Sequence, residues 1–147
     1  MRHCSEGGVC GDDTGSAVVE FVLLGTLLLV PIVYFVLTVG VIQGASFAAA
    51  GAADHAAKAF VSSPDAGAAR RAADSAVEVS MADFGMDSAT WAVTIACDRS
   101  DCLEAGAAVT VAVSVKVPLP MVPSRGTAPT ALGTVSAHAT QMVGRFR

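Results

Sequence analysis

Residues 15–42 read GSAVVEFVLLGTLLLVPIVYFVLTVGVI, a long apolar stretch. Its 22 residues from position 21 to position 42 carry no charge. A helix rises about 1.5 Å per residue, so 22 residues extend about 33 Å and can cross a hydrocarbon core of about 30 Å. The stretch therefore predicts one membrane-crossing helix over residues 16–42. Pro31, in its middle, is expected to kink this helix without breaking it.

One acidic residue, Glu20, lies near the start of the apolar stretch. An ionised carboxylate inside lipid costs several kcal/mol, and such residues rarely occur in a membrane span without a task. If the chain is cut between Gly15 and Ser16, the new amino group of Ser16 would supply a cationic partner, in the same molecule or in a neighbour. The alternative is a carboxylate that reaches water at the membrane surface, since Glu20 lies only about 6 Å along the helix from Ser16.

The composition is that of a membrane-anchored protein with room for one small domain beyond the anchor. The chain has 147 residues, of which 53% are hydrophobic and 15% charged, and its mean hydropathy is +0.59. The net charge is −4 and no basic stripe is present, so the electrostatic footprint of nucleic-acid binding is missing. We therefore expect a membrane partner and no nucleic-acid partner.

The first 15 residues, MRHCSEGGVCGDDTG, are polar, rich in glycine and without periodicity. They predict a short cytoplasmic leader that is cleaved off. A secretory signal would instead have an apolar core of about 7 to 15 residues followed by the cut, and the apolar stretch here is too long for that. Cys4 and Cys10 of the leader are expected to be reduced and unpaired.

After the span, residues 43–62 are rich in alanine and lack proline, which predicts that the membrane helix continues. Positions at helical spacing suggest the packing face of this extension. They are Phe47, Ala50, Ala53 or Asp54, and Ala57.

A second helix is predicted over residues 64–84, with Ser63 as N-cap, Pro64 and Asp65 in the first turn, and Gly85 as the stop. Its expected apolar stripe consists of Ala69, Ala72, Ala73, Ala76 and Val79.

From Thr90 the period changes to two, which indicates half-buried strands. One strand carries Trp91, Val93 and Ile95, and a second has valine at every other position from 109 to 117. The prolines at 118 and 120 end the second strand because proline cannot donate to a ladder. A loop over residues 121–129 and a last strand over residues 134–143 follow. We thus predict an α+β fold: a long N-terminal transmembrane helix that continues into a small extracytoplasmic head, residues 63–147, with a second helix and a short antiparallel sheet.

Cys97 and Cys102 enclose four residues between two predicted strands, where a hairpin turn would bring their Cα atoms within bridging range. A disulfide is the favoured interpretation, and it would place the head in an oxidising compartment. A metal pair and two free thiols are the alternatives, although C-x4-C without further Cys or His nearby is a weak metal pattern.

No motif for catalysis, for a phosphate-binding loop or for a cofactor surrounds the remaining polar residues. His55 and His138 lie in a predicted helix and a predicted strand without a recognisable arrangement around them. We expect no enzyme activity, no cofactor and no metal site.

The segment GSAVVEF, residues 15–21, resembles the N-terminus of type IV prepilins, with a small residue at the cut and an acid at the fifth position after it. Residues 15–60 look like the TadE-like family of pseudopilins, in which the Glu20-Phe21 pair matches a Glu-Phe or Glu-Tyr signature. The cysteine pair, the run at 117–120 and the ending at 145–147 also look like longer members of that group. The major Flp pilins are similar at this end but lack a head of this size.

The resemblance implies a minor pseudopilin that acts in assembly of a Tad/Flp pilus. A prepilin peptidase would cut after Gly15, and Ser16 would become the mature N-terminus. Glu20 would aid processing or neutralise the Ser16 amine of an adjacent subunit. The implied partners are other pilins or pseudopilins and the Tad secretion machinery, and the implied topology has the N-terminus in the cytoplasm and the head outside.

An unprocessed, single-pass, signal-anchored surface protein with a binding head is the alternative that the sequence leaves open. The two differ at the mature N-terminus: the pseudopilin should begin at Ser16, whereas the signal-anchored protein should keep Met1 or lose only that methionine.

Overall fold

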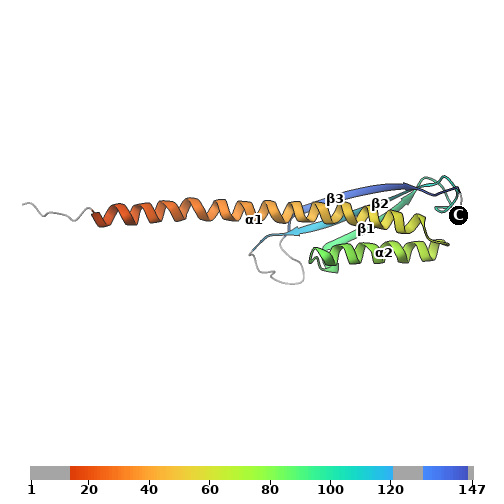
Figure 1. Ribbon diagram of the computed structural model, residues 1–147, viewed down its shortest axis with the longest axis horizontal. Coiled ribbons are helices and arrows are strands. Elements are labelled where there is room, and N and C mark those ends of the chain that lie inside the picture. Colours follow the sequence, from red (N-terminus) through yellow and green to blue (C-terminus); the bar gives the residue numbers. More distant parts are fainter. Residues whose placement is uncertain (1–13, 121–130, 146–147) are drawn as a thin grey trace, which may run out of the picture. The chain divides into compact units, whose positions relative to one another are not determined.

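The computed structural model describes residues 14–120 and 131–145, with side chains described from residue 17 onward (Figure 1). The elements in chain order are α1 (Thr14–Val61), α2 (Ala66–Asp83), a short 3-10 helix η1 (Ser88–Thr90), β1 (Trp91–Cys97), β2 (Ala108–Pro118) and β3 (Ala131–Met142). This is the α+β fold that the sequence predicts. The predicted leader up to residue 13 and the predicted loop over residues 121–129 lie outside the described residues.

Helix α1 is 48 residues long and continues through Pro31. Every side chain described between residues 17 and 37 is exposed, and burial begins at Thr38. The chain accordingly divides into two units, Met1–Leu37 and Thr38–Arg147. We call the exposed part of α1, residues 17–37, the stem, and the second unit the packed unit.

The stem gives the protein one helix that is long and apolar enough to cross a membrane. Its most apolar part has a mean hydropathy of 2.6, and none of that part is buried within the protein. A row of exposed Val, Leu, Ile and Phe side chains is unfavourable in water, because each loses about 1.5–3 kcal/mol relative to burial. The stem is therefore a candidate single membrane span near the N-terminus.

Within the packed unit, α1 turns a face of small residues towards the core. The buried residues on this face are Ala45, Ala48, Ala49, Ala52, Ala53, Ala56, Ala57 and Phe60. The expectation is thus right for Ala53 and Ala57 and wrong for Phe47, which is 70% exposed, and for Ala50, which is also exposed. The reason is that alanine and glycine surround this part of the helix almost completely, so the sequence does not fix which side is apolar. Phe60, the large residue that lies in phase with Ala53 and Ala57, belongs to the buried side.

Helix α2 begins two residues later than predicted because its N-cap is Asp65. The Asp65 carboxylate accepts a hydrogen bond from the backbone N–H of Ala68 at 2.8 Å. The predicted cap, Ser63, is instead buried and donates its hydroxyl to the carbonyl of Ala59 in the last turn of α1. A carboxylate at the N-cap accepts from an orphan N–H and also favours the positive end of the helix dipole.

The buried stripe of α2 also differs from the prediction. It consists of Ala69, Ala73, Val77, Ser80 and Met81. Val79 was expected on this stripe but is 63% exposed, because a residue two positions from Val77 and from Met81 lies on another side of a helix with 3.6 residues per turn.

The C-terminal end of α2 is as predicted. Gly85 has a φ of +66°, and its N–H bonds the carbonyl of Ala82 while the N–H of Met86 bonds that of Met81. This is a Schellman motif, in which glycine adopts the left-handed conformation without a Cβ penalty.

The three strands form an antiparallel sheet in the order β1-β2-β3. The valines at 109, 111, 113, 115 and 117 of β2 are all buried, as their alternation predicts. In the middle of the sheet, Val113 pairs with Val93 of β1 and with Ala137 of β3. These side chains share one core with the alanine face of α1 and the stripe of α2, so both helices cover the same face of the sheet. The last strand begins three residues before the predicted position, and β2 ends at Pro118 as expected.

Candidate functional site

The candidate processing site lies at the beginning of α1. Because the helix begins at Thr14, the bond between Gly15 and Ser16 falls within its first turn. The side chains of residues 14–16 are outside the described part. Phe21 is 78% exposed, and Glu20 is exposed beside it.

Glu20 is the one charged residue between Asp13 and Asp54. Among residues whose side chains are described, it has no hydrogen-bond or ion-pair partner. Ser16 precedes it by four residues, so the two positions lie on the same side of the helix, about 6 Å apart along the axis. The carboxylate is thus available to a cation placed at the level of Ser16.

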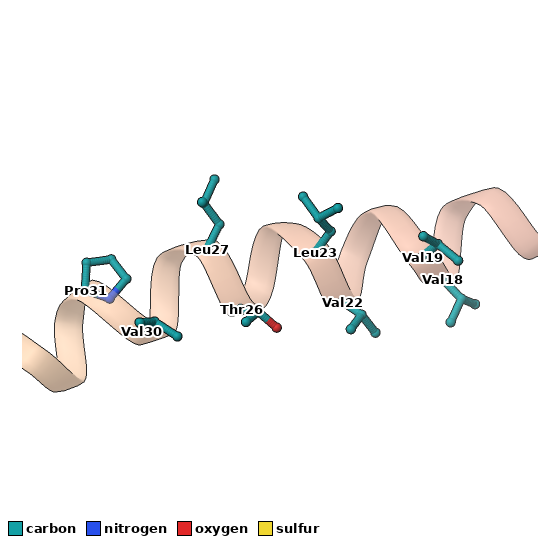
Figure 2. A pocket seen from close by; sticks show the side chains of 8 residues that line it. All are labelled: Val18, Val19, Val22, Leu23, Thr26, Leu27, Val30 and Pro31. Atoms are coloured by element: carbon teal, nitrogen blue, oxygen red, sulfur yellow. The ribbon is translucent and has the colours of Figure 1, made fainter.

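Figure 2 shows the side of the stem that follows this site. One row consists of Val18, Val22, Thr26 and Val30, and a second row consists of Val19, Leu23, Leu27 and Pro31. All eight residues come from a single helix, so they form an open apolar face and not an enclosed cavity. Such a face has the shape and chemistry for lipid tails or for another apolar helix.

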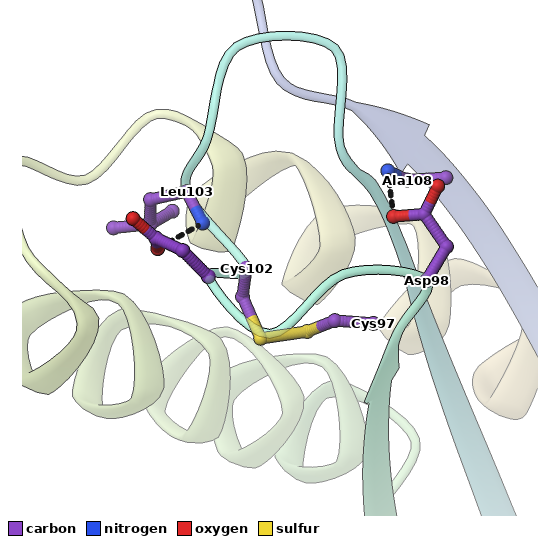
Figure 3. The surroundings of a disulfide bond; sticks show 6 residues. Cys97, Asp98, Cys102, Leu103 and Ala108 are labelled. Carbon is purple, nitrogen blue, oxygen red and sulfur yellow. Dashed lines mark hydrogen bonds between the residues drawn. A yellow bond between two sulfur atoms is a disulfide. The ribbon is translucent and has the colours of Figure 1, made fainter.

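The second predicted pair, Cys97 and Cys102, forms a disulfide with a Cα–Cα distance of 5.4 Å (Figure 3). Cys97 is the last residue of β1, and Cys102 lies in the connection to β2. The disulfide, not a metal pair or free thiols, is therefore the arrangement in the structure.

Two aspartate carboxylates accept hydrogen bonds from backbone N–H groups in and beside the turn that the disulfide closes. The Asp98 carboxylate accepts from the N–H of Ala108 at 2.8 Å, and the Asp101 carboxylate accepts from the N–H of Leu103 at 3.0 Å (Figure 3). Arg99 also forms an exposed ion pair with Glu104 at 2.8 Å. Both carboxylates near the cysteines thus hold the backbone, which explains why this turn is polar.

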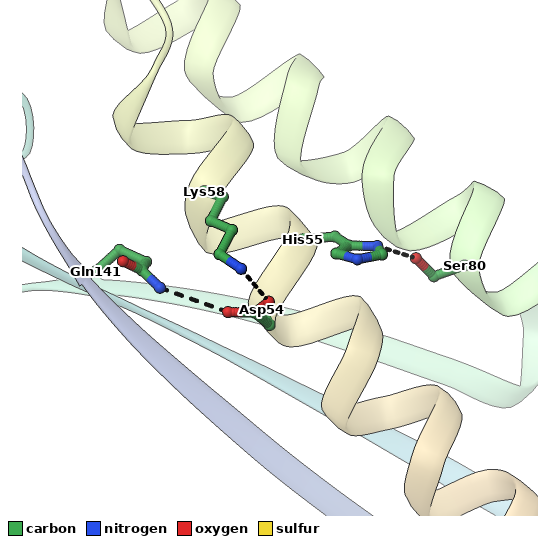
Figure 4. A network of polar contacts seen from close by, with 5 residues as sticks. All are labelled: Asp54, His55, Lys58, Ser80 and Gln141. Carbon is green, nitrogen blue, oxygen red and sulfur yellow. Dashed lines mark hydrogen bonds and ion pairs between the residues drawn. The ribbon is translucent and has the colours of Figure 1, made fainter.

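A polar cluster on α1 connects it with its neighbours in the packed unit (Figure 4). The Lys58 ammonium donates to the Asp54 carboxylate at 2.6 Å, and the Gln141 amide of β3 donates to the other carboxylate oxygen at 3.4 Å. The pKa of Asp54 is lowered, chiefly by the hydrogen bond from Lys58 and further by the positive charge of Lys58 and by Gln141, while desolvation opposes the shift. Asp54 therefore stays ionised and joins α1 to β3.

His55 lies beside Ser80 of α2, with 3.4 Å between His55 Nδ1 and Ser80 Oγ. The Ser80 hydroxyl already donates to the carbonyl of Ala76 at 2.8 Å, so its oxygen accepts from the ring. Asp54 is engaged with Lys58 and Gln141 and does not orient the histidine. Ser80, His55 and Asp54 thus lie near one another. Their hydrogen bonds join α1 to α2 and to β3 and are not arranged as a Ser-His-Asp triad.

Among residues 14–120 and 131–145, no group of three His, Cys, Asp or Glu side chains is placed to hold a metal ion. His138 is exposed on β3. Sequence reasoning did not find the contact between Asp54 and Gln141, since these residues are 87 positions apart. The i to i+4 spacing of Asp54 and Lys58 was the sequence signal for the ion pair between these two residues, but not for the contact with Gln141.

Comparison with protein-family models, with curated proteins and with solved structures finds no match for the chain.

Proposed function

We propose that the chain is a TadE-like minor pseudopilin that acts in assembly of a Tad/Flp pilus. In this proposal a prepilin peptidase cuts after Gly15, the stem anchors the protein in the membrane, and the packed unit lies outside the cytoplasm. The observation that carries the proposal is Glu20: it is the sole charged residue of the exposed, apolar stem and lies four residues after Ser16. The motif of residues 15–21 supports the same function through its resemblance to prepilins.

The position of the proposed cut in the first turn of α1 favours processing. A peptidase needs access to an extended backbone, so it must first unwind the helix around Gly15. The first four N–H groups of a helix have no acceptor within it, so opening this turn breaks few hydrogen bonds. Cleavage would then release the Ser16 amine about 6 Å from Glu20 along the helix.

A charge pair between Ser16 and Glu20 would act differently before and after assembly. In lipid, an unpaired carboxylate is costly, while a carboxylate that meets an ammonium group from a neighbouring stem is compensated. The apolar face of the stem would bring stems together through close packing. The partners proposed for it are the prepilin peptidase, other pilins or pseudopilins, and the Tad secretion machinery.

The disulfide supports the proposed topology. Bonds of this type persist in oxidising compartments and are rare in the cytoplasm. Cys97 and Cys102 belong to the packed unit, so that unit would be on the outer side and the N-terminus on the cytoplasmic side.

The test is the mass and N-terminal sequence of protein purified from its native host. The proposal predicts a shortened form that begins at Ser16. A chain that keeps residues 1–15, with no shortened form, would contradict the pseudopilin and support the unprocessed, signal-anchored surface protein.

Glu20→Ala tests the role of the acid directly. We expect impaired maturation or impaired pilus assembly, because the Ser16 amine loses its partner. Glu78→Ala, an exposed substitution of the same kind on α2, is the control and should leave both unchanged. Normal processing together with normal pili in the Glu20→Ala variant would show that Glu20 has no role in maturation or assembly.

A further inference from the structure

The connection between β1 and β2, residues 98–107, contains no helix or strand and covers part of the core of the packed unit. Leu103 packs against the buried residues, as do both cysteines of the disulfide, and Ala107 is fully buried. Figure 3 shows that the disulfide ties the end of β1 to this connection. The bond therefore belongs to a segment that closes one end of the core.

The same connection holds the residue that follows β3. The N–H of Gly106 donates to the carbonyl of Val143 at 3.0 Å, and the N–H of Val143 donates to the carbonyl of Ala107 at 2.9 Å. Gly106 has a φ of +83°, a conformation that residues with a Cβ rarely adopt, so these two hydrogen bonds depend on the local shape of the connection. Val143 is 2% exposed and is the last buried residue in the described part of the chain. The connection thus fixes the C-terminal end of the core.

The other interactions of the connection are on the surface. Residues 98–101 are exposed, and the ion pair between Arg99 and Glu104 joins side chains that are 44% and 53% exposed. Exposed ion pairs of this kind stabilise weakly. Among residues 14–120 and 131–145, the disulfide is the one covalent cross-link, and a cross-link restricts the chain even when the hydrogen bonds around it open.

The middle of the sheet does not depend on the connection. Strand β2 pairs with β1 from Val109 onward and with β3 from Ala108 onward, and its buried valines pack in the core that both helices share. Loss of the cross-link should therefore be felt first at the connection and at the residue that it holds.

We propose that the Cys97–Cys102 disulfide is a redox-sensitive latch on this end of the core. In the oxidised state it keeps the connection on the core, and the connection keeps Val143 paired through Gly106 and Ala107. In the reduced state the connection opens and releases Val143, while the sheet and both helices stay in place. In a reducing compartment this end of the packed unit is open, and oxidation closes it. The inference goes beyond the proposed function, since it depends neither on processing nor on a pilus.

Reduction by a dithiol such as dithiothreitol supplies everything that the opening step needs. One thiolate of the reagent attacks a sulfur of the disulfide and forms a mixed disulfide, and the displaced cysteine leaves as a thiolate that takes up a proton. The second thiolate of the reagent then frees the other cysteine, and the reagent becomes a cyclic disulfide. Two electrons have passed from the reagent to Cys97 and Cys102, and the reverse exchange with an oxidised disulfide closes the latch. Both cysteines are half-buried and the turn between them is exposed, so the reagent can approach from the turn.

The test is hydrogen–deuterium exchange at single amides of the full-length protein in detergent micelles, with and without dithiothreitol. We expect reduction to speed exchange at Gly106 and Val143 by about tenfold or more, because the cross-link no longer restricts the opening of the connection. Exchange at Val113 and Ala137, which pair with each other in the middle of the sheet, should change little.

Two double variants show which cysteines carry the effect. Cys97→Ser with Cys102→Ser should exchange fast at Gly106 and at the residue after β3 whether or not dithiothreitol is present. Cys4→Ser with Cys10→Ser keeps the bond, and it should respond to dithiothreitol as the unaltered chain does.

Equal exchange at Gly106 and Val143 in the oxidised and the reduced protein overturns the inference, because the connection then stays closed without the bond. A rise of the same size at Val113 and Ala137 also overturns it, since the bond would then support the whole packed unit and not one end of it. Failure of the Cys97→Ser variant pair to fold counts as this second result. Both results leave the pseudopilin proposal untouched, which the mature N-terminus tests separately.

Discussion

Asp65, and not the buried Ser63, caps α2, and the difference is one of hydrogen-bond partners. Ser63 lies between the end of α1 and the start of α2, and its hydroxyl donates a hydrogen bond to the carbonyl of Ala59 in α1. Asp65 is free to accept from the N–H of Ala68. A polar residue between two helices can thus serve either one, and its neighbours in space decide which.

Asp65→Ala should lower the free energy of unfolding by about 1 kcal/mol, within the range of about 0.5–2 kcal/mol for lost N-caps. The Ala68 N–H would lose its acceptor. Asp74→Ala, an exposed change of the same kind inside α2, should have little effect. Chemical denaturation of both variants in detergent measures this, and equal stabilities would contradict the assignment of the cap.

Asp54 should make stability depend on pH at the acidic end. Its pKa in the folded protein lies below the usual value of 3.8, so the folded state favours the ionised carboxylate. This stabilisation is present above the unfolded pKa and is lost as the pH falls through the lowered folded pKa. Asp54→Asn should therefore show a weaker loss of stability on acidification than the unaltered chain, measured by thermal unfolding across the acidic range. Asp74→Asn should retain the original dependence, and identical pH profiles for all three chains would refute the role of Asp54.

At the scale of elements, α1 combines two kinds of surface in one continuous helix. The stem carries large apolar residues that are exposed, whereas the packed segment of α1 presents mostly alanine, together with Phe60, to the core. Alanine allows the helix backbone to approach the sheet and α2 closely. The small residues Ala137 and Ala139 of β3 contribute to the same core.

Ala53→Leu should destabilise the packed unit by about 1–3 kcal/mol, because the position is fully buried and extra methylene groups force neighbours to shift. Ala50→Leu, three residues earlier on the exposed side, should change stability by less than about 0.5 kcal/mol. Thermal unfolding of the two variants distinguishes the two sides of α1. Similar effects at both positions would mean that the buried face is assigned incorrectly.

At the scale of the whole molecule, the buried core of the described residues lies within the packed unit. The first buried residue is Ala45, and every described stem residue up to Leu37 is exposed. The stem should therefore contribute membrane anchoring and not the stability of the packed unit.

A chain that begins at Thr38 should keep the unfolding temperature of the full-length protein, because every removed side chain that the structure describes, from residue 17 to residue 37, is exposed. A chain that begins at Ser62 should fail to fold, since it lacks the whole alanine face of α1 and Phe60. Circular dichroism during heating measures both. If the chain that begins at Thr38 unfolds at a lower temperature than the full-length protein, the stem contributes to the stability of the fold.

The sequence alone determined the features that depend on local pattern. Twenty-two uncharged residues define a candidate membrane span by length, alternating valines define a strand and its buried side, and Gly85 ends a helix because it tolerates positive φ. The cysteine pair was predictable as a disulfide because only four residues separate its members.

Other features depend on contacts in the folded protein, because the local sequence pattern allows more than one arrangement. Alanine occupies most positions of α1 between residues 45 and 59 and gave little direction, so the sheet and α2 determined that Phe47 faces outward and Ala49 inward. The same holds for Val79, for the choice between Ser63 and Asp65, and for the contact of Asp54 with Gln141. For the buried side of α1 and for Asp54 the free energy depends on partners distant in the chain, which the residue itself does not indicate, whereas Ser63 and Asp65 each had an acceptor or donor nearby and only the structure shows which one they use.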